Sequence, residues 1–178
     1  IEAHSFPTRR SSDLDIVVHE NQNNQMEEIF RSMRTNLQFM LKEGQKVVLF
    51  TSSTSGEGKT FNAANLSVSF GLLGKKVILV GLDIRRPRLA ELFGINDHKH
   101  GITNLLVKDN PTIEDIYEQI LPSGVNKNLD LLMAGPIPPN PAELIARNSL
   151  DIIINLLKEK YDYIMIDTAP VGLVTDTL

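Results

Sequence analysis

Short runs of consecutive hydrophobic residues alternate along the chain with longer segments in which hydrophobic residues recur every three or four positions. The runs predict buried strands at 46–51, 77–80, 129–133 and 164–166. The helical spacing predicts helices at 27–41, 59–73, 112–120 and 149–160. Continuous hydrophobic strands between helices are typical of a parallel sheet that is covered on both faces. The pattern therefore predicts an α/β fold with three layers, α/β/α, and a mainly parallel sheet.

The first predicted helix is amphipathic, and its hydrophobic positions follow helical spacing. These positions are Ile29, Met33, Leu37 and Met40. Arg31 and Arg34 lie elsewhere on the surface of the same helix. Gly44 ends the helical pattern before the first strand.

The N-terminal segment differs in character from the rest of the chain. Residues 4–14 match, over their whole length, the translation of a DNA adapter used in short-read sequencing. We therefore expect residues 1–14 to be an artefact, residues 15–24 to be a linker, and residues 25–178 to form one domain. The alternative is a native polar linker in which Arg9 and Arg10 act as a targeting signal.

Composition narrows the classes of function. The chain has 178 residues, of which 42% are hydrophobic and 22% charged, as in ordinary soluble globular domains. The formal net charge of −4 gives no overall basic field to attract nucleic acid, so we expect no nucleic-acid partner. The chain has no cysteine, which excludes disulfides, thiolate catalysis and cysteine-ligated metals. No hydrophobic run approaches the ~20 residues that span a bilayer.

A glycine-containing loop follows the first strand and opens a helix. Glycines let the backbone amides approach phosphate oxygens, and the helix N-terminus adds partial positive charge there. A lysine supplies a full charge, and the next hydroxyl is placed to ligate Mg²⁺. The usual first glycine is replaced by Ser53, so the loop is a variant P-loop. We predict that ATP is bound by Ser53, Thr54, Ser55, Gly56, Glu57, Gly58, Lys59, Thr60 and Phe61.

Two carboxylates follow predicted strands. Asp167 ends the strand at 164–166, and Asp83 follows the strand at 77–80. The carboxyl ends of parallel strands face the ligand crevice of such a sheet. We therefore predict that Thr60, Asp83 and Asp167 hold magnesium or its waters. An aspartate that only caps a turn is the alternative for either carboxylate taken alone.

The order of these motifs resembles the bacterial tyrosine kinase family from about residue 26 to the end. The resemblance rests on a Glu-x-x-Arg-x-x-Arg pattern before the first strand, the P-loop, and a second strand that ends near Asp83. It also rests on Arg85-Arg86-Pro87, the proline-rich 135–144 stretch, and the segment from Tyr161 through Asp167 to Val171.

The resemblance implies an ATP-dependent kinase that phosphorylates tyrosines, including those on neighbouring copies of itself. It implies that Lys59 and Asp83 act in catalysis and that Glu28, Arg31 and Arg34 contact other subunits in a ring. The kinase would regulate polymerisation and export of capsule or exopolysaccharide at the cytoplasmic face of the membrane. Its partner would be a membrane-embedded polysaccharide co-polymerase or activator segment, fused or separate. The alternative for the three charged residues is a solvated helix face with weak intrahelical pairs.

The chain departs from the family pattern in two places. Gly81 stands where the first acid of Asp-x-Asp is expected, which leaves three explanations: a pseudokinase, a sequence error, or sufficiency of Asp83 alone. The resemblance also implies further strands and a tyrosine-rich tail, so we expect the domain to be incomplete at its C-terminus. Among the tyrosines, Tyr161 and Tyr163 are expected to be packing residues, and Tyr117 to be half-buried.

The sequence is also compatible with two other functions. One is a nucleotide-switched ATPase of the Min and Par type, whose P-loop usually carries an extra lysine where this chain has Thr54. The other is a catalytically impaired module in which ATP binding controls assembly, and Gly81 is the feature that favours it.

Overall fold

The computed structural model describes residues 16–19 and 24–171, and its centre is a five-stranded sheet in the order β1-β5-β2-β4-β3. Four strands run parallel, and β3 pairs antiparallel with β4 at one end of the sheet. The strands are β1 Val47–Phe50, β2 Val77–Gly81, β3 Leu121–Pro122, β4 Leu129–Leu132 and β5 Tyr163–Asp167. The predicted mainly parallel sheet is confirmed, and the short β3 is an addition that the hydrophobic pattern did not indicate.

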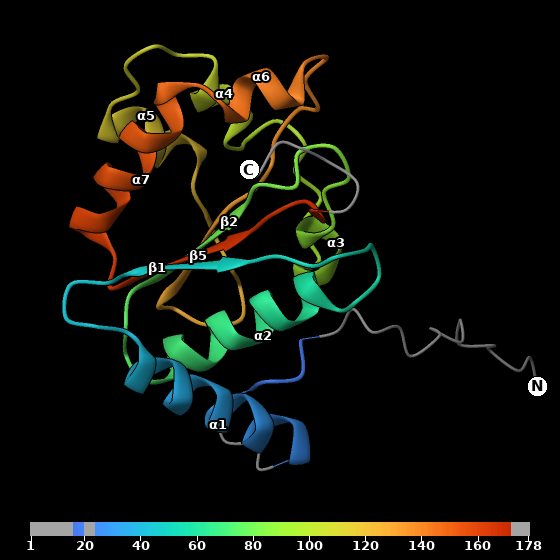
Figure 1. Cartoon of the computed structure of the whole chain (residues 1–178), viewed down its shortest axis with the longest axis vertical. Coiled ribbons are helices and arrows are strands. Elements are labelled where there is room, and N and C mark those ends of the chain that lie inside the picture. The colour runs from blue at the N-terminus through green and yellow to red at the C-terminus, as the bar shows by residue number, and fades with distance from the viewer. Residues whose placement is uncertain (1–15, 20–23, 172–178) are drawn as a thin grey trace, which may run out of the picture.

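Helices cover both faces of the sheet, so the predicted three layers are confirmed (Figure 1). One face carries α1 Gln25–Met40 and α2 Lys59–Leu72, and the opposite face carries α4 Thr103–Leu106, α5 Ile113–Gln119, α6 Pro141–Ile145 and α7 Asn148–Lys160. The short helix α3 Leu89–Phe93 follows β2 and packs near the start of α2. Each of the four predicted helices is present to within two residues at either end.

Alternate residues of the strands supply two hydrophobic cores, one on each face of the sheet. Ile78, Val80 and Ile164 belong to the core under α4–α7, where Ile153 and Leu157 of α7 are fully buried. The second core lies under α2 and contains Val77, Leu79, Met165, Ala63 and Phe70. Because both faces are buried, each central strand is hydrophobic at nearly every position, which explains the continuous runs in the sequence.

Helix α1 packs against α2, and it does so through a face that the hydrophobic pattern did not indicate. Phe30 is fully buried there, and its ring lies 5.9 Å from the ring of Phe61 in a tilted arrangement. Of the predicted stripe only Leu37 packs against the core, whereas Ile29 and Met40 are exposed by 50% and 76%. Ile29, Met33 and Met40 thus form a second, exposed hydrophobic face of α1, whereas Leu37 belongs to the face that packs on the core.

The segment before α1 reaches the core through its backbone. The N–H groups of Val17 and Val18 both donate to Oδ1 of Asn65, at 2.8 and 3.3 Å, and Val18 is buried. Asn65 is itself buried within α2. The proposed artefact at 1–14 lies outside the described residues, as does part of the 15–24 segment.

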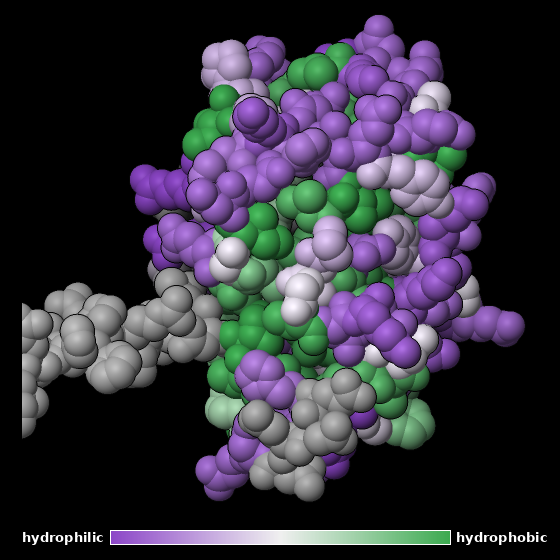
Figure 2. Space-filling model, turned by 180° about the vertical axis from the view of Figure 1, so that it is seen from behind, coloured by the Kyte–Doolittle hydropathy of each residue, from purple (hydrophilic) through white to green (hydrophobic). Residues whose placement is uncertain are grey.

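The surface reflects this layered arrangement. Seen from behind, the part of the molecule over α4–α7 is mainly hydrophilic, whereas hydrophobic residues gather lower down and towards the middle (Figure 2). Among the residues that the structure describes, no helix is both long enough and hydrophobic enough to cross a bilayer.

Candidate functional site

The phosphate loop leaves β1 and turns into α2 through two glycines with positive φ. Gly56 has φ of 90° and Gly58 has φ of 81°, a region that residues with a Cβ rarely adopt. Gly58 is the N-cap of α2, so the helix begins at Lys59. The amides of the first turn therefore stand at the helix N-terminus, where they favour an anionic ligand.

Glu57 stabilises the loop through two hydrogen bonds. Its carboxylate accepts a hydrogen bond from the Ser53 amide at 3.1 Å and from the Thr54 hydroxyl at 2.9 Å. The buried Ser52 hydroxyl donates to the Thr54 carbonyl at 2.9 Å. Ser52 was not among the predicted site residues. Its position directly after a strand and before the loop was the only signal that could have identified it.

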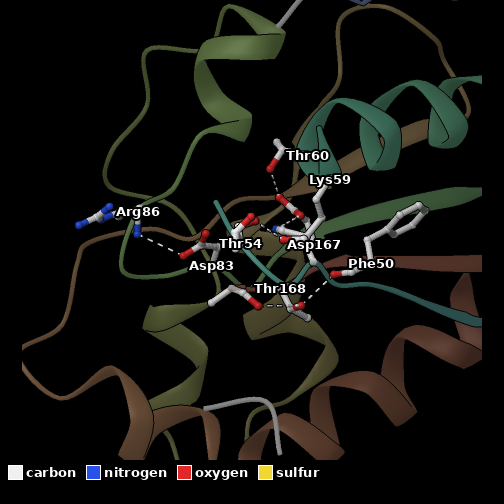
Figure 3. Close-up of polar contacts among 10 residues, drawn as sticks. Phe50, Thr54, Lys59, Thr60, Asp83, Arg86, Asp167 and Thr168 are labelled. Carbon is white, nitrogen blue, oxygen red and sulfur yellow. Dashed lines mark hydrogen bonds and ion pairs between the residues drawn. The ribbon is translucent and has the colours of Figure 1, made fainter. Parts of the chain in front are cut away.

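Lys59, Thr60 and Asp167 meet at the end of β5 (Figure 3). The Lys59 ammonium pairs with one carboxylate oxygen of Asp167, and the Thr60 hydroxyl donates to the other at 2.8 Å. The Lys59 and Asp167 side chains are only 7% and 3% exposed. The structure thus brings together the predicted lysine, the predicted hydroxyl and the predicted strand-end carboxylate.

Sheet order explains why these residues meet. Strand β5 lies between β1 and β2, and Asp167 is in register with Phe50 on one side and Gly81 on the other. The ends of three neighbouring strands therefore lie at one level of the sheet edge. Thr168 fixes this corner, because its hydroxyl donates to the Phe50 carbonyl at 2.8 Å. Thr168 was not among the predicted site residues either, although it directly follows Asp167 in the sequence.

Burial raises the pKa of Asp167 above its ordinary value. Lys59 and Thr60 oppose this rise, because a cation and a hydrogen-bond donor favour the ionised form, while Asp83 adds to it through like-charge repulsion. A carboxylate in this setting gains from any further positive charge placed beside it.

Asp83 lies just beyond the end of β2, next to Asp167 (Figure 3). Its backbone amide donates to the Asp167 carbonyl at 3.1 Å, and its carboxylate accepts from the Arg86 amide at 3.2 Å. The Asp83 side chain is partly exposed. The two predicted carboxylates thus belong to residues whose backbones are hydrogen-bonded at the same edge of the sheet.

These oxygen donors suit a magnesium ion. Mg²⁺ is bound through one or two carboxylates, a hydroxyl, waters and substrate phosphates, rather than by an all-protein cage. Thr60, Asp83 and Asp167 could supply the protein share of such a set. Consistent with this, no group of three or more His, Asp or Glu side chains among the described residues is arranged to hold a metal alone.

The Phe61 side chain does not face the phosphate loop. Its ring packs against Phe30 and the core under α2. Only the backbone of Phe61, in the first turn of α2, is placed to contact a nucleotide. The packing instead ties the start of the nucleotide-binding helix to α1.

The three charged residues of α1 are in different environments. Arg31 lies on the exposed side and pairs with Glu28 at 3.2 Å and with Glu27 at 3.6 Å. Arg34 is partly buried, and its guanidinium donates to the Ser69 carbonyl at 2.7 Å and to the Ser69 hydroxyl at 3.1 Å. Desolvation lowers the pKa of Arg34, with a smaller contribution from Arg31. Within one chain, Arg34 is thus a link between α1 and α2.

Gly81 is buried at the end of β2, and its backbone is not in the positive-φ region. A Cβ at this position would lie 3.2 Å from Cδ1 of Leu89 and 3.3 Å from the Ala134 amide nitrogen. These contacts are tight, so the packing around position 81 is fitted to a residue without a side chain.

The three tyrosines differ in their burial. Tyr161 is buried and its hydroxyl donates to Asp130 at 2.7 Å, and the Tyr163 ring lies 4.4 Å from that of Phe70. Both are packing residues, as predicted. Tyr117 is 51% exposed and therefore about half-buried, as predicted, while its neighbour Ile116 is the position of α5 that faces the core.

Comparison with known proteins places this site in a family. The sequence model of the AAA domain family matches residues 45–177. The putative tyrosine-protein kinase CapB of Staphylococcus aureus is 34% identical over 169 residues, which cover 94% of this chain and 72% of that protein. The tyrosine-protein kinase YwqD of Bacillus subtilis (strain 168) is 38% identical over 150 residues, or 84% of this chain and 61% of that protein.

Solved structures agree. The chimerical protein CapA2B2 superposes with a TM-score of 0.80 at 34% identity, over 90% of this chain and 69% of that one. A more distant match is the septum site-determining protein MinD of Pyrococcus horikoshii OT3, complexed with Mg-ADP. Its TM-score is 0.58 at 26% identity, over 74% of this chain and 51% of that one. With this P-loop, these strand-end carboxylates and these relatives, the chain belongs to the family of bacterial tyrosine-protein kinases.

Proposed function

We propose that this chain is the nucleotide-binding part of a kinase that transfers the γ-phosphoryl group of ATP to protein tyrosines. The observation that carries the proposal is the convergence of Lys59, Thr60 and Asp167 with Asp83 at one edge of the sheet. Phosphoryl transfer depends mainly on alignment and charge stabilisation, and this arrangement supplies both. The names of the relatives, which are tyrosine kinases, support tyrosine as the acceptor.

Each residue has a role in this proposal. The first-turn amides of α2 and the Lys59 ammonium bind the phosphates and stabilise the negative charge that is transferred. Thr60 and Asp167, with Asp83 beside them, would hold Mg²⁺ or its waters, and the metal would neutralise charge on the phosphate oxygens. Asp83 orients the tyrosine hydroxyl and accepts its proton. Because a phenol has a pKa of about 10, this base helps only if the hydroxyl is placed within hydrogen-bond reach. Asp83 acts alone in this role, since Gly81 offers no second carboxylate.

The wider setting of this activity is also a proposal. We infer a role in capsule or exopolysaccharide production at the cytoplasmic face of the membrane, in a ring of copies that uses Glu28, Arg31 and Arg34 as contacts. The exposed Glu28–Arg31 pair supports such a contact on α1. A polysaccharide co-polymerase or activator segment in the membrane, fused or separate, is the expected partner.

Two products distinguish this function from its alternatives. The chain is incubated with Mg²⁺ and γ-labelled ATP and a tyrosine-containing protein, and phosphotyrosine and free phosphate are measured together. We expect phosphotyrosine that is lost in Lys59→Met and retained in the control Lys127→Met, which lies at the other end of the sheet. Free phosphate without phosphotyrosine would refute the kinase and favour a Min-like ATPase, a fold relative seen with Mg-ADP. Bound ATP without either product would favour the assembly module.

A further inference from the structure

A cavity of about 380 Å³ opens beside the phosphate site, at the ends of β2 and β4. Gly81 and Asp167 lie in its lining, together with Asp83, so the cavity is continuous with the catalytic edge of the sheet. Its volume falls within the roughly 300–1,000 Å³ of typical ligand pockets. No residue of the nucleotide-binding loop is among those that line the cavity, so the cavity lies beside the loop at the same edge of the sheet.

The inner wall of this cavity is hydrophobic. Leu89, Met133 and Ala134 line it and are each less than 5% exposed, while Ile137 stands at the rim with 64% exposure. Gly81 contributes no side chain to the lining, and a Cβ at this position would already lie 3.2 Å from Cδ1 of Leu89. A flat apolar ring with one polar tip matches a compartment with hydrophobic walls and a carboxylate at its base.

The mouth of the cavity carries positive charge. Arg85, Arg86 and Arg88 fall within four consecutive residues, line the opening and are exposed. The Arg86 side chain points away from Asp83 and Asp167, so its guanidinium is directed outward while its amide holds Asp83 (Figure 3). A guanidinium presents a planar set of donors that suits a carboxylate.

The acidic side chains around the cavity do not neutralise the positive charge of the arginines at its opening. Asp83 and Asp167 lie at the base, where they serve the metal and the hydroxyl. Asp97 is occupied locally, because it accepts from the amides of Lys99 and His100 at 2.9 Å each and contacts the His100 ring at 2.7 Å. Glu91 is the one other carboxylate in the described lining, which also contains three arginines.

We propose that this cavity binds the tyrosine ring of the acceptor polypeptide, and that Arg86 and Arg88 at its mouth select acceptors with acidic residues beside the tyrosine. The inference rests on the proposed kinase function for the identity of the ring. The preference for acidic acceptors follows from the arginines, and it would hold even if phosphoryl transfer were slow. An acidic acceptor would be repelled by the negative charge of the ATP phosphates, and arginines at the opening of the cavity would offset that repulsion.

The test measures binding rather than transfer. Short fluorescent peptides with a central tyrosine flanked by acidic, uncharged or basic residues are titrated against the full chain with Mg²⁺ and a non-hydrolysable ATP analogue. We expect the acidic peptide to bind about tenfold more tightly than the uncharged one, the factor for two ion pairs at a rim. Replacing the tyrosine by phenylalanine keeps most of this affinity, and replacing it by alanine loses it.

A matched pair of variants isolates the arginines. Arg86→Glu with Arg88→Glu should reverse the preference towards the basic peptide. The control pair Lys75→Glu with Lys127→Glu makes the same change in net charge far from the cavity, and should leave the preference intact. Equal binding of all three peptides to the unmodified chain would overturn the proposal, and so would a preference that survives in the arginine pair or an alanine peptide that binds as well as the tyrosine peptide. Because phosphotyrosine is not the readout, absence of transfer counts against the kinase function alone.

Discussion

Restoring an acid at position 81 is the change that most directly tests how this site is packed. The Gly81 backbone lies outside the positive-φ region, so Gly81→Asp introduces no backbone strain. The cost is instead steric, because a Cβ would meet Cδ1 of Leu89 at 3.2 Å and the Ala134 amide nitrogen at 3.3 Å. Leu89 must shift by a few tenths of an ångström, and the Ala134 backbone has little freedom to move.

The expected loss of stability has two parts. Overpacking of this kind costs about 1–3 kcal/mol. For a chain of 178 residues this lowers Tm by roughly 2–12 °C, at about 2–4 °C per kcal/mol. The added carboxylate also stands beside Asp167, whose pKa is already raised by burial, and near Asp83. Each further unit of pKa shift is worth about 1.4 kcal/mol, so repulsion adds to the steric cost when no cation is present.

Thermal unfolding with and without Mg²⁺–ATP separates the two parts. Gly81→Asn has the same shape without the charge, so in a chelator it should be less stable than the unmodified chain but more stable than Gly81→Asp. A ligand at 100 times its Kd stabilises by about 2.7 kcal/mol. We expect Gly81→Asp to gain more than Gly81→Asn from Mg²⁺–ATP, because the extra carboxylate favours the cation. If Gly81→Asp matches the unmodified chain in a chelator, the steric argument is wrong. If the two variants gain equally, the position is too far from the metal to matter.

Two further predictions concern stability away from position 81. Arg34→Ala should lower the free energy of unfolding by about 1–3 kcal/mol, because it removes charge-assisted hydrogen bonds to Ser69. The control Arg31→Ala should change it by less than about 1 kcal/mol, because Arg31 makes only exposed ion pairs. Chemical denaturation measures both values, and equal losses would contradict the role of Arg34 as a link between α1 and α2. For Asp97, the His100 amide and ring hold the pKa of the carboxyl at about 2, below its unfolded value of about 3.9. The stability this provides is present above about pH 4 and lost as the pH falls towards 2, so unfolding curves of Asp97→Asn should depend less on pH in that window, and an unchanged dependence would contradict the assignment.

The sheet and the catalytic edge were predictable because they depend on local signals. Buried parallel strands appear as continuous hydrophobic runs, and an acid at the end of such a run must lie at the ligand edge. Asp167 follows this rule directly. Asp83 is two residues beyond β2, yet its amide still reaches the Asp167 carbonyl, so the edge extends past the regular strand.

Features that depend on contacts distant in sequence were not predictable. The Gly101 and Gly135 backbones meet so closely that a Cβ on Gly101 would lie 2.1 Å from the Gly135 nitrogen. The Ile102 amide donates to the Met133 carbonyl at 2.8 Å, which ties the segment before α4 to the end of β4. Gly135 begins the proline-rich 135–144 stretch, but nothing in that stretch indicates a contact with Gly101. The helices α3 and α4, of five and four residues, are too short for a periodic pattern to identify.

Helix α1 shows why an amphipathic pattern does not reveal which partner covers a hydrophobic face. Its inward face is anchored by Phe30 and Arg34, a pair that no hydrophobicity count would select. The Ser69 carbonyl and hydroxyl accept two hydrogen bonds from Nη1 of Arg34, which partly offset the cost of burying the guanidinium, whereas its Nε is buried without a hydrogen-bond partner. The more regular stripe, with Ile29 and Met33, is left on the outside beside the Arg31–Glu28 pair. A hydrophobic stripe bordered by charges is what a contact between copies requires, whereas a purely solvated face would gain nothing from exposed Ile and Met side chains. The residues of α1 therefore divide into a set centred on Arg34, which links α1 to α2, and an outward set centred on Arg31; in the proposed ring contact the second set would be the more accessible part, and Arg34 would take part in addition to its bonds to Ser69.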